Sequence, residues 1–329
     1  MASKIEQVLL LGCRKLYDKG IGRFEFPPLE RETNINRSSD LIYNQLASGK
    51  PCMISRFGAT EIASLTNYLG VKNKSRNTWK VLTREEPEWW WNENLRTQMT
   101  EWSGFFPSTD ENLARFGELM LEDVKQLDIL VSWLSDEARF VHLFPQASFI
   151  HLICLHPFWA ENPWTRYLEN KKVLVVHPFS DEIESQYKNN RTKLFQNENV
   201  LPPFELITYK AVQSIGGSTQ FASWFDALQH MKDEIDRIDY DVCLLGCGAY
   251  GMPLAAHIKR TGKQAVHVGG ALQLFFGIIG KRWEDNLSFG ADVLGEKGKY
   301  AALFNEYWIR PGKASIIPTA DKVENACYW

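Results

Sequence analysis

The fold of this chain is decided by residues 240–283, which read YDVCLLGCGAYGMPLAAHIKRTGKQAVHVGGALQLFFGIIGKRW. The apolar run Val242–Leu245 predicts a buried strand, which a glycine turn follows. A helix is expected to begin near Tyr250, and a second strand is expected over Gln264–Val268. Because short apolar strands joined by a helix form a βαβ unit, we expect a Rossmann-like α/β fold with a mostly parallel sheet and helices on both faces.

The turn between the first strand and the helix, GCGAYG, has the pattern G-x-G-x-x-G. Backbone N–H groups and a helix N-terminus at such a turn can face a phosphate. In a site for NAD, an acidic residue closes the second strand and binds the ribose hydroxyls. Here that strand ends in His267 and Val268, before Gly269 and Gly270. The sequence therefore favours a nucleotide-type ligand over a nicotinamide dinucleotide.

The composition limits the classes of protein to which this chain can belong. The 329 residues are 44% hydrophobic and 23% charged, which is typical of a globular chain with a large core. The net charge of −3 gives no basic footprint, so we expect no nucleic-acid partner. Six scattered cysteines without a CxxC pair favour a reducing cytoplasm, and no apolar run is long enough to be a transmembrane segment. Twelve tryptophans point either to a sugar ligand or to a large core.

No low-complexity linker divides the chain, so we expect a single α/β domain over 1–329 that begins with a helical segment, 1–48. Residues 2–19 carry Ile5, Val8, Leu9 and Leu16 at helical spacing, with Lys and Arg between them. Such an amphipathic helix either packs on the domain or makes a peripheral contact with a membrane surface. Because its basic face is thin, we expect packing.

Residues 71–110 are expected to form an insertion, because they are irregular and aromatic and include Trp89, Trp90 and Trp91. This segment is a lid over the site, a packing flange or an oligomer interface, and the sequence does not decide between them.

A second turn that faces a ligand is predicted near residue 56. Cys52–Ser55 reads as a short strand, Arg56-Phe57-Gly58 as a turn, and Thr60 as the cap of the following helix. This order places Arg56 and Glu61 at the carboxyl end of a strand, where open α/β sheets bind ligands. An arginine there suits a diphosphate. Glu61 is a metal ligand, a general base or a first-turn carboxylate that complements the helix dipole.

Two β-rich runs, Phe149–Phe158 and Lys172–Phe179, each end in His-Pro-Phe. This pattern predicts that His156 and His177 each lie at the carboxyl end of a strand. Either histidine is a buried hydrogen-bonding group or a ligand contact, and we favour the ligand site for His177. Ser180 is expected to cap the helix that follows. The clearest helical periodicity in the chain covers Thr219–Ile238.

These two turns together resemble the GT-D class of bacterial glycosyltransferases. That family has an early Arg-Phe-Gly-Asp-Gly-Glu element at a strand-to-helix turn and a late strand, glycine turn, helix and strand that end in a Gly-His-type loop. The corresponding residues here are Arg56–Glu61, Leu245–Gly251 and His267–Gly270. The string GGALQLFFGIIGKRW is also similar to uncharacterised proteins of bacterial surface-polysaccharide clusters.

The resemblance implies a glycosyltransferase that moves a sugar from a nucleotide-sugar donor to a glycan or lipid-linked acceptor. It implies Glu61 and His177 as catalytic residues. The implied nucleotide-sugar-binding residues are Arg56, Phe57, Gly58, Ser180, Gly246, Gly248, Ala249, Tyr250, Gly251, His267, Gly269, Gly270, Gln273, Lys281 and Arg282.

In the family an Asp-x-Glu pair is associated with a divalent metal, but this chain has Ala59 at the position of that Asp and retains only Glu61. Hard cations require several oxygen ligands. Either another acid helps Glu61 to hold Mn²⁺ or Mg²⁺, or the enzyme is metal-independent, which we favour. Arg56, Lys281 or Arg282 would then neutralise the diphosphate.

Two other functions remain open from the sequence. LLGCGAYG also resembles the glycine-rich loop of S-adenosylmethionine-dependent methyltransferases, although such loops usually open their domain and an acid usually ends the next strand. The alanine at position 59 also fits a nucleotide- or glycan-binding protein without catalytic activity.

Overall fold

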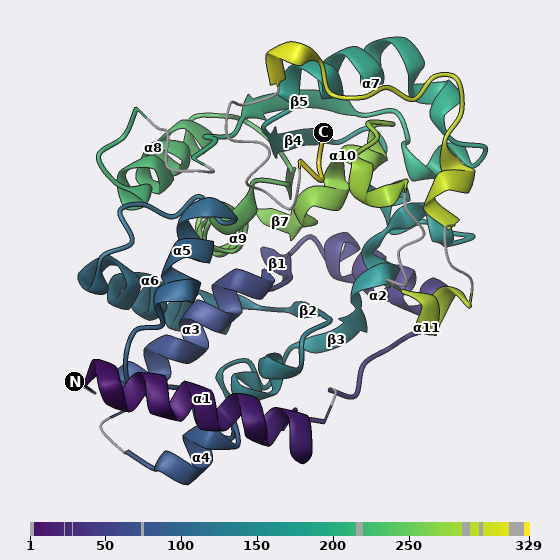
Figure 1. Ribbon diagram of the computed structural model, residues 1–329. Helices are drawn as coiled ribbons and strands as arrows, with labels where there is room; N and C mark the ends of the chain where they lie inside the picture. The colour runs from purple at the N-terminus through teal and green to yellow at the C-terminus, as the bar shows by residue number, and fades with distance from the viewer. Residues whose placement is uncertain are drawn as a thin grey trace.

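A computed structural model describes residues 3–22, 24–27, 29–73, 76–214, 220–284, 290–295, 299–315 and 326–329. Its centre is a seven-stranded sheet with the strand order β3-β2-β1-β7-β6-β4-β5, in which every pair of neighbours is parallel (Figure 1). The strands are β1 Cys52–Ser55, β2 Ile129–Ser132, β3 Ser148–His151, β4 Lys172–His177, β5 Glu205–Lys210, β6 Val242–Leu245 and β7 Gln264–His267. The predicted βαβ unit and the Rossmann-like α/β class are confirmed.

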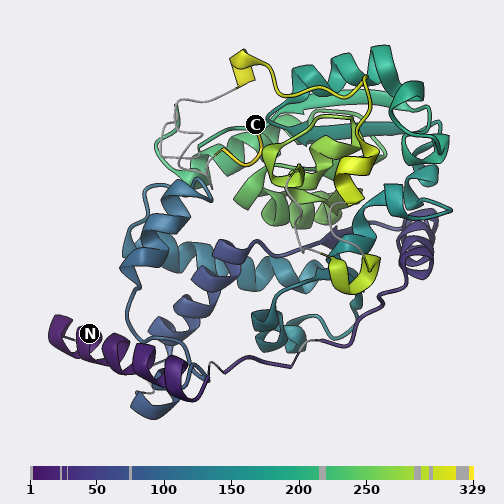
Figure 2. The same ribbon diagram turned by 45° about the vertical axis from the view of Figure 1, so that its right-hand side comes forward.

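Helices cover both faces of the sheet (Figures 1 and 2). Their bounds are α1 Lys4–Gly20, α2 Ile35–Ala47, α3 Ala59–Lys72, α4 Thr78–Leu82, α5 Glu93–Glu101, α6 Asp110–Asp123, α7 Ser180–Leu194, α8 Trp224–Asp236, α9 Gly251–Arg260, α10 Leu272–Phe275 and α11 Ala291–Leu294. The core on one face is shared by α3, α5, α6, α8 and α9, and the core on the other by α2, α7 and α10. Within the described residues, no helix combines the length and the apolar character needed to cross a membrane.

The inner strands β1, β2, β4 and β6 read as nearly continuous apolar runs because both of their faces are buried. Successive side chains of a strand point to opposite faces, so Leu174 enters one core and Val175 the other. Cys243 and Leu244 of β6 divide in the same way.

The order of the strands creates crevices at their carboxyl ends. β4 is followed by α7 on one face, whereas its neighbour β6 is followed by α9 on the opposite face. The same reversal separates β7, which is followed by α10, from β1, which is followed by α3. In open α/β sheets, ligands bind where neighbouring strands diverge in this way. The ends of β4, β6, β7 and β1 are therefore the positions at which the fold builds a site.

Three predicted helix starts are wrong. Helix α3 begins at Ala59 rather than after Thr60, because the carbonyl of Gly58 already accepts the Ile62 N–H at 3.0 Å. Ser180 is the first residue of α7 and not its cap, because the Phe179 carbonyl already accepts the Ile183 N–H at 2.9 Å. The helix predicted over 219–238 begins at Trp224, where the Ser223 hydroxyl caps it, and Thr219 lies outside the described residues.

The strand predicted to run from Phe149 to His156 is also wrong. β3 ends at His151, whose Nδ1 accepts the N–H of Ile153 and turns the chain into a 3₁₀ helix, Leu152–Leu155. His156 therefore follows that turn instead of lying at the end of a strand.

Helix α1 forms as predicted but packs on the body through the opposite face. Ile5, Val8, Leu9 and Leu16 are 64% to 74% exposed, whereas Arg14 is buried. The pattern correctly grouped the apolar residues on one face, but that face points away from the domain.

The predicted insertion 71–110 contains α4, α5 and a tryptophan run that packs on α3. Trp89 and Trp90 are buried beside Val81, and Trp91 stacks on Tyr68 with ring centroids 6.5 Å apart. The backbone at Glu88 passes so close to α3 that a Cβ on Gly70 would lie 2.2 Å from the Glu88 carbonyl oxygen.

This contact predicts the effect of Gly70→Ala. Because the obstructing atom belongs to the backbone, the substitution should lower the free energy of unfolding by roughly 1–3 kcal/mol. Gly12→Ala in α1 is the matched control, because no atom lies within 4 Å of its added Cβ, and it should stabilise the chain by about 0.5–1 kcal/mol. Urea denaturation of both variants measures the difference, and a neutral Gly70→Ala would contradict the close packing.

Candidate functional site

A cavity of about 580 Å³ lies where β1, β4, β6 and β7 end. One residue at the carboxyl end of each strand lines it: Arg56 after β1, His177 of β4, Gly246 after β6 and His267 of β7. The structure thus brings together the two turns that the sequence predicts to face a ligand. The predicted site residues that line the cavity are Arg56, Gly58, Glu61, His177, Gly246, Gly248, Ala249, His267, Gly269, Gly270, Gln273 and Arg282.

Five predicted site residues are not among those that line the cavity. Phe57 is fully buried against Phe140, and the Tyr250 ring stacks on Trp224 with centroids 4.9 Å apart. The others are Ser180, which is buried at the start of α7, Gly251, which lies against His267, and Lys281, which is exposed.

Arg56 is the cation held deepest in this site. Its Nε is buried without a hydrogen-bond partner, while Nη1 donates to the Phe57 carbonyl at 3.0 Å. The guanidinium lies over the ring of Trp133, 5.3 Å from its centroid, and the Trp133 indole N–H donates to the same carbonyl at 2.9 Å. Burial lowers the pKa of Arg56, although an arginine remains charged in proteins. The arrangement leaves the guanidinium with unused capacity to bind an anion.

Glu61 lies at the N-terminus of α3, where its carboxylate folds back over Gly58. A Cβ on Gly58 would be 1.8 Å from Glu61 Oε2, so only glycine leaves room for the carboxylate in this position. The positive end of the helix dipole interacts favourably with a carboxylate there. A carboxylate is thereby held at the rim of the cavity, on the same turn as Arg56.

Three histidines line the cavity, and all are neutral at pH 7. Burial lowers the pKa of His177, His267 and His156 to about 3 in each case, and the charge of Arg56 adds to the effect for His267 and His156. Because Nδ1 of His177 accepts the Phe179 N–H, its Nε2 carries the proton. His177 is therefore a hydrogen-bond donor at pH 7.

The other two rings are oriented by neighbouring hydroxyl groups. His267 Nδ1 lies 2.9 Å from the Ser55 hydroxyl, and His156 Nδ1 lies 2.9 Å from the Tyr300 hydroxyl. Each contact fixes the orientation of its imidazole against the cavity.

The glycines of the G-x-G-x-x-G turn have different physical roles. A Cβ on Gly246 would lie 2.6 Å from Cδ2 of His177, and one on Gly251 would lie 2.2 Å from Nε2 of His267. These two glycines therefore make room for the histidine rings. Gly248 has a φ of +58° with open space around it, so its requirement is conformational.

The wall opposite this turn comes from the end of the chain. Arg282 Nη1 donates to the Tyr328 hydroxyl at 3.1 Å, and the guanidinium lies 4.9 Å from the centroid of that ring. Gln273 Nε2 donates to the Tyr328 carbonyl at 3.1 Å, which leaves Gln273 Oε1 buried without a partner. Trp329 packs on Phe179 with centroids 5.9 Å apart.

The sequence reasoning missed most of the aromatic lining. These residues are Trp102, Trp133, Phe179, Trp283, Tyr300, Tyr328 and Trp329. Trp133 directly follows β2, the neighbour of β1, so its place at the carboxyl edge of the sheet is local in origin. The places of Tyr328 and Trp329 are not, because only tertiary contacts bring residues 326–329 to the cavity.

The cavity offers few protein ligands to a divalent cation. Glu61 is the one carboxylate in its lining, and the described residues contain no group of three or more His, Cys, Asp or Glu side chains that could hold a metal ion. Because Mg²⁺ binds through one or two carboxylates together with waters and substrate phosphates, a metal here would have to be held by Glu61 and a bound diphosphate.

The neutral histidines predict a loss of stability in acid. The pKa of each histidine is about 3 in the folded state and 6.5 in an unfolded chain. Between pH 3 and pH 6.5 the unfolded chain therefore binds more protons than the folded one. The free energy of unfolding should therefore fall as the pH drops below about 6.5, by at most about 1.4 kcal/mol per pH unit for each histidine. Glu137, whose pKa burial raises to about 7, opposes part of this loss.

Urea denaturation at several pH values between 5 and 7 isolates the contribution of one ring. His177→Gln should flatten the dependence by up to about 1.4 kcal/mol per pH unit, whereas His142→Gln on the surface should leave it unchanged. Equal slopes for wild type and His177→Gln would show that His177 titrates normally.

Comparisons of the chain with protein-family models, with curated proteins and with solved structures find no match. The function must therefore be inferred from the geometry and chemistry of the cavity.

Proposed function

We propose that this chain is a cytoplasmic glycosyltransferase of bacterial surface-polysaccharide synthesis. It moves a sugar from a nucleotide-sugar donor to a glycan or lipid-linked acceptor. The observation that carries the proposal is the half-buried side chain of Arg56, whose buried Nε has no hydrogen-bond partner. It lines a cavity with several aromatic rings at the carboxyl edge of a parallel sheet. Such edges bind nucleotides in open α/β proteins.

The charges of the cavity suit a diphosphate. Among its lining residues, Arg56 and Arg282 are cationic and Glu61 is the one anion. The glycine turn and the N-terminus of α9 meet the same space through Gly248, Ala249 and Met252. A planar guanidinium and a helix N-terminus are both preferred partners of phosphate oxygens.

The remaining surface suits the sugar and the base. A volume of about 580 Å³ lies within the range of small-molecule sites. Trp133, Trp283 and Tyr300 offer aromatic faces on which rings stack. The N–H of the neutral His177 adds a hydrogen-bond donor for a hydroxyl or phosphate oxygen.

In the proposed reaction an acceptor hydroxyl attacks the anomeric carbon of the donor, and the bond from that carbon to the phosphate oxygen breaks. Glu61 takes the proton of the hydroxyl, and the diphosphate leaves with the electron pair. Arg56 and Arg282 stabilise the charge on the diphosphate, and the cavity contributes chiefly by positioning the reactants. The proposed step is written without a metal, so that the two arginines alone neutralise the diphosphate.

A thermal-shift screen tests the donor. UDP-, GDP-, CMP- and TDP-sugars are compared with S-adenosylmethionine, each with and without Mn²⁺, and at least one nucleotide-sugar should raise the melting temperature. Arg56→Gln should weaken its binding at least about tenfold, because a charge-assisted contact to phosphate is lost. Arg37→Gln is the control, since Arg37 has 77% of its side chain exposed and lies outside the cavity lining.

Two results, one from this screen and one from a transfer assay with the donor that it identifies, would overturn the proposal. Stabilisation by S-adenosylmethionine alone would indicate a methyltransferase. Binding of a nucleotide-sugar without turnover on any glycan or lipid-linked acceptor would indicate a binding protein.

Glu61→Gln tests the catalytic base. Transfer should fall by about 10²–10⁴-fold while donor binding and the fold are retained, because the amide cannot accept the proton. Glu111→Gln removes another first-turn carboxylate, on α6 and outside the cavity, so it controls for loss of a helix-dipole interaction. Full activity of Glu61→Gln would remove Glu61 from the mechanism.

A further inference from the structure

We infer that α1 docks the protein on the surface of an anionic lipid bilayer. The docking surface, called here the outer stripe, consists of Ile5, Val8, Leu9 and Leu16 of α1, Ile21 and Phe24 just after it, and Trp79 of α4. This inference concerns a surface outside the cavity and does not rest on the proposed function.

The outer stripe gathers most of the exposed apolar side chains of the described chain. Nine large hydrophobic side chains are exposed in the described residues, and seven of them belong to the stripe. The other two, Leu41 and Trp102, lie on α2 and just after α5. Scattered exposed hydrophobics need no explanation, but a contiguous group of them marks a contact surface.

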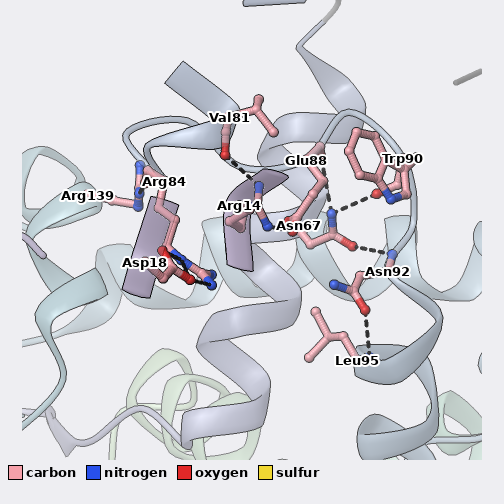
Figure 3. Close-up of polar contacts among 10 residues, drawn as sticks. All are labelled: Arg14, Asp18, Asn67, Val81, Arg84, Glu88, Trp90, Asn92, Leu95 and Arg139. Atoms are coloured by element: carbon pink, nitrogen blue, oxygen red, sulfur yellow. Dashed lines mark hydrogen bonds and ion pairs between the residues drawn. The ribbon is translucent and has the colours of Figure 1, made fainter. Parts of the chain in front are cut away.

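Polar contacts hold the opposite face of α1 on the body of the protein, and Figure 3 shows them. Arg14 is buried, pairs with Glu88 and donates to the Val81 carbonyl at 2.6 Å. One turn later, the Asp18 carboxylate accepts hydrogen bonds from Nε and Nη2 of Arg84, and the shortest of them joins Nη2 to Oδ2 at 2.6 Å.

Arg84, which donates to Asp18, is itself held in place by the rest of the domain. Arg139 donates to the backbone carbonyls of Arg84 and Glu85 at 3.0 and 2.9 Å. These directional bonds set the rotation of α1 about its axis, so the apolar face cannot turn toward the domain without breaking them. The helix lies at the outside of the molecule, with α4 beside it (Figure 2).

The charge around the stripe suits an anionic surface. Among the described residues of 3–27, the exposed charged residues are three lysines, Lys4, Lys15 and Lys19, and one acid, Glu25, whereas Glu6 and Asp18 are partly buried. None of the three lysines forms an ion pair with another described residue. A helix with an apolar face and flanking lysines lies in the plane of a membrane interface. Trp79, with its ring edge against Tyr17 at 6.0 Å, adds an aromatic of the kind enriched at that depth.

A second copy of the chain fits the stripe less well. Pairing α1 with its own copy in either direction would bring exposed lysines toward exposed lysines, without an exposed carboxylate on the helix to offset them. Like charges across an interface oppose association. Anionic headgroups offer the opposite charge.

Sedimentation of the full chain with vesicles tests this inference. The protein should bind vesicles of phosphatidylglycerol and phosphatidylcholine, and bind phosphatidylcholine alone more weakly. Val8→Gln/Leu16→Gln should reduce binding at least about tenfold, because two apolar side chains leave the interface. Leu41→Gln changes an exposed leucine away from the stripe and should bind like wild type. Circular dichroism and thermal unfolding establish that each variant is folded.

Two further measurements test separately the charge of the lysines and the contact of α1 with the bilayer. Lys15→Gln/Lys19→Gln should weaken binding to the anionic vesicles, whereas Lys50→Gln/Lys188→Gln, at exposed lysines elsewhere, should not. Cys13 is the one exposed cysteine of the six, so a polarity-sensitive dye attached there should shift to shorter wavelength when vesicles are added.

The inference is wrong if wild type ignores anionic vesicles or if Val8→Gln/Leu16→Gln binds them equally well. It is also wrong if wild type is a dimer by analytical ultracentrifugation, dissociates in Val8→Gln/Leu16→Gln and does not bind vesicles, because the stripe would then be a self-interface.

Discussion

The guanidinium of Arg56, with its buried Nε, is the charge around which the cavity is arranged. Arg56 lies at the end of β1, next to β7. Gly269 is required beside it for two reasons: its own φ is +75°, and a Cβ on it would lie 2.8 Å from Arg56 Nε. Burial is the larger cause of the lowered pKa of His156 and His267, and the charge of Arg56 lowers it further. Because the imidazoles are neutral, the two arginines and the single carboxylate of the lining leave a positive potential in a medium of low dielectric. An anion that enters the cavity is bound more strongly than it would be in water.

The sheet topology explains why residues distant in sequence share this potential. β1 and β4 leave the sheet by opposite faces, and β6 and β7 return between them, so four strand ends from both halves of the chain meet at one edge. The histidines then serve as packing partners of the glycines. His177 occupies the space that Gly246 leaves free, and His267 the space that Gly251 leaves free. The glycine turn is therefore shaped by the rings behind it as well as by any ligand in front of it.

How far the sequence predicts this structure depends on whether the deciding contact is local. The bounds of β1 and β6 follow from apolar runs that end at a turn, and Arg56 and Glu61 follow from the position of that turn. The starts of α3 and α7 were misplaced because the carbonyls of Gly58 and Phe179 already accept the N–H groups of Ile62 and Ile183, which Thr60 and Ser180 were expected to satisfy. The aromatic wall at Tyr328 carries no signal in the sequence, because its place is set by Arg282 and Gln273.

Helix α1 shows what periodicity leaves undetermined. A period of 3.6 residues identifies which side chains share a face, but it does not say which face meets the body. Arg14 decides that here, because a buried guanidinium is stable only with its partners, and Glu88 and the Val81 carbonyl supply them at a fixed place. The apolar stripe then faces outward as a consequence. If the acceptor in the proposed reaction is lipid-linked, a protein held at the bilayer by α1 meets it by diffusion in two dimensions, so the two inferences support each other while resting on separate parts of the chain.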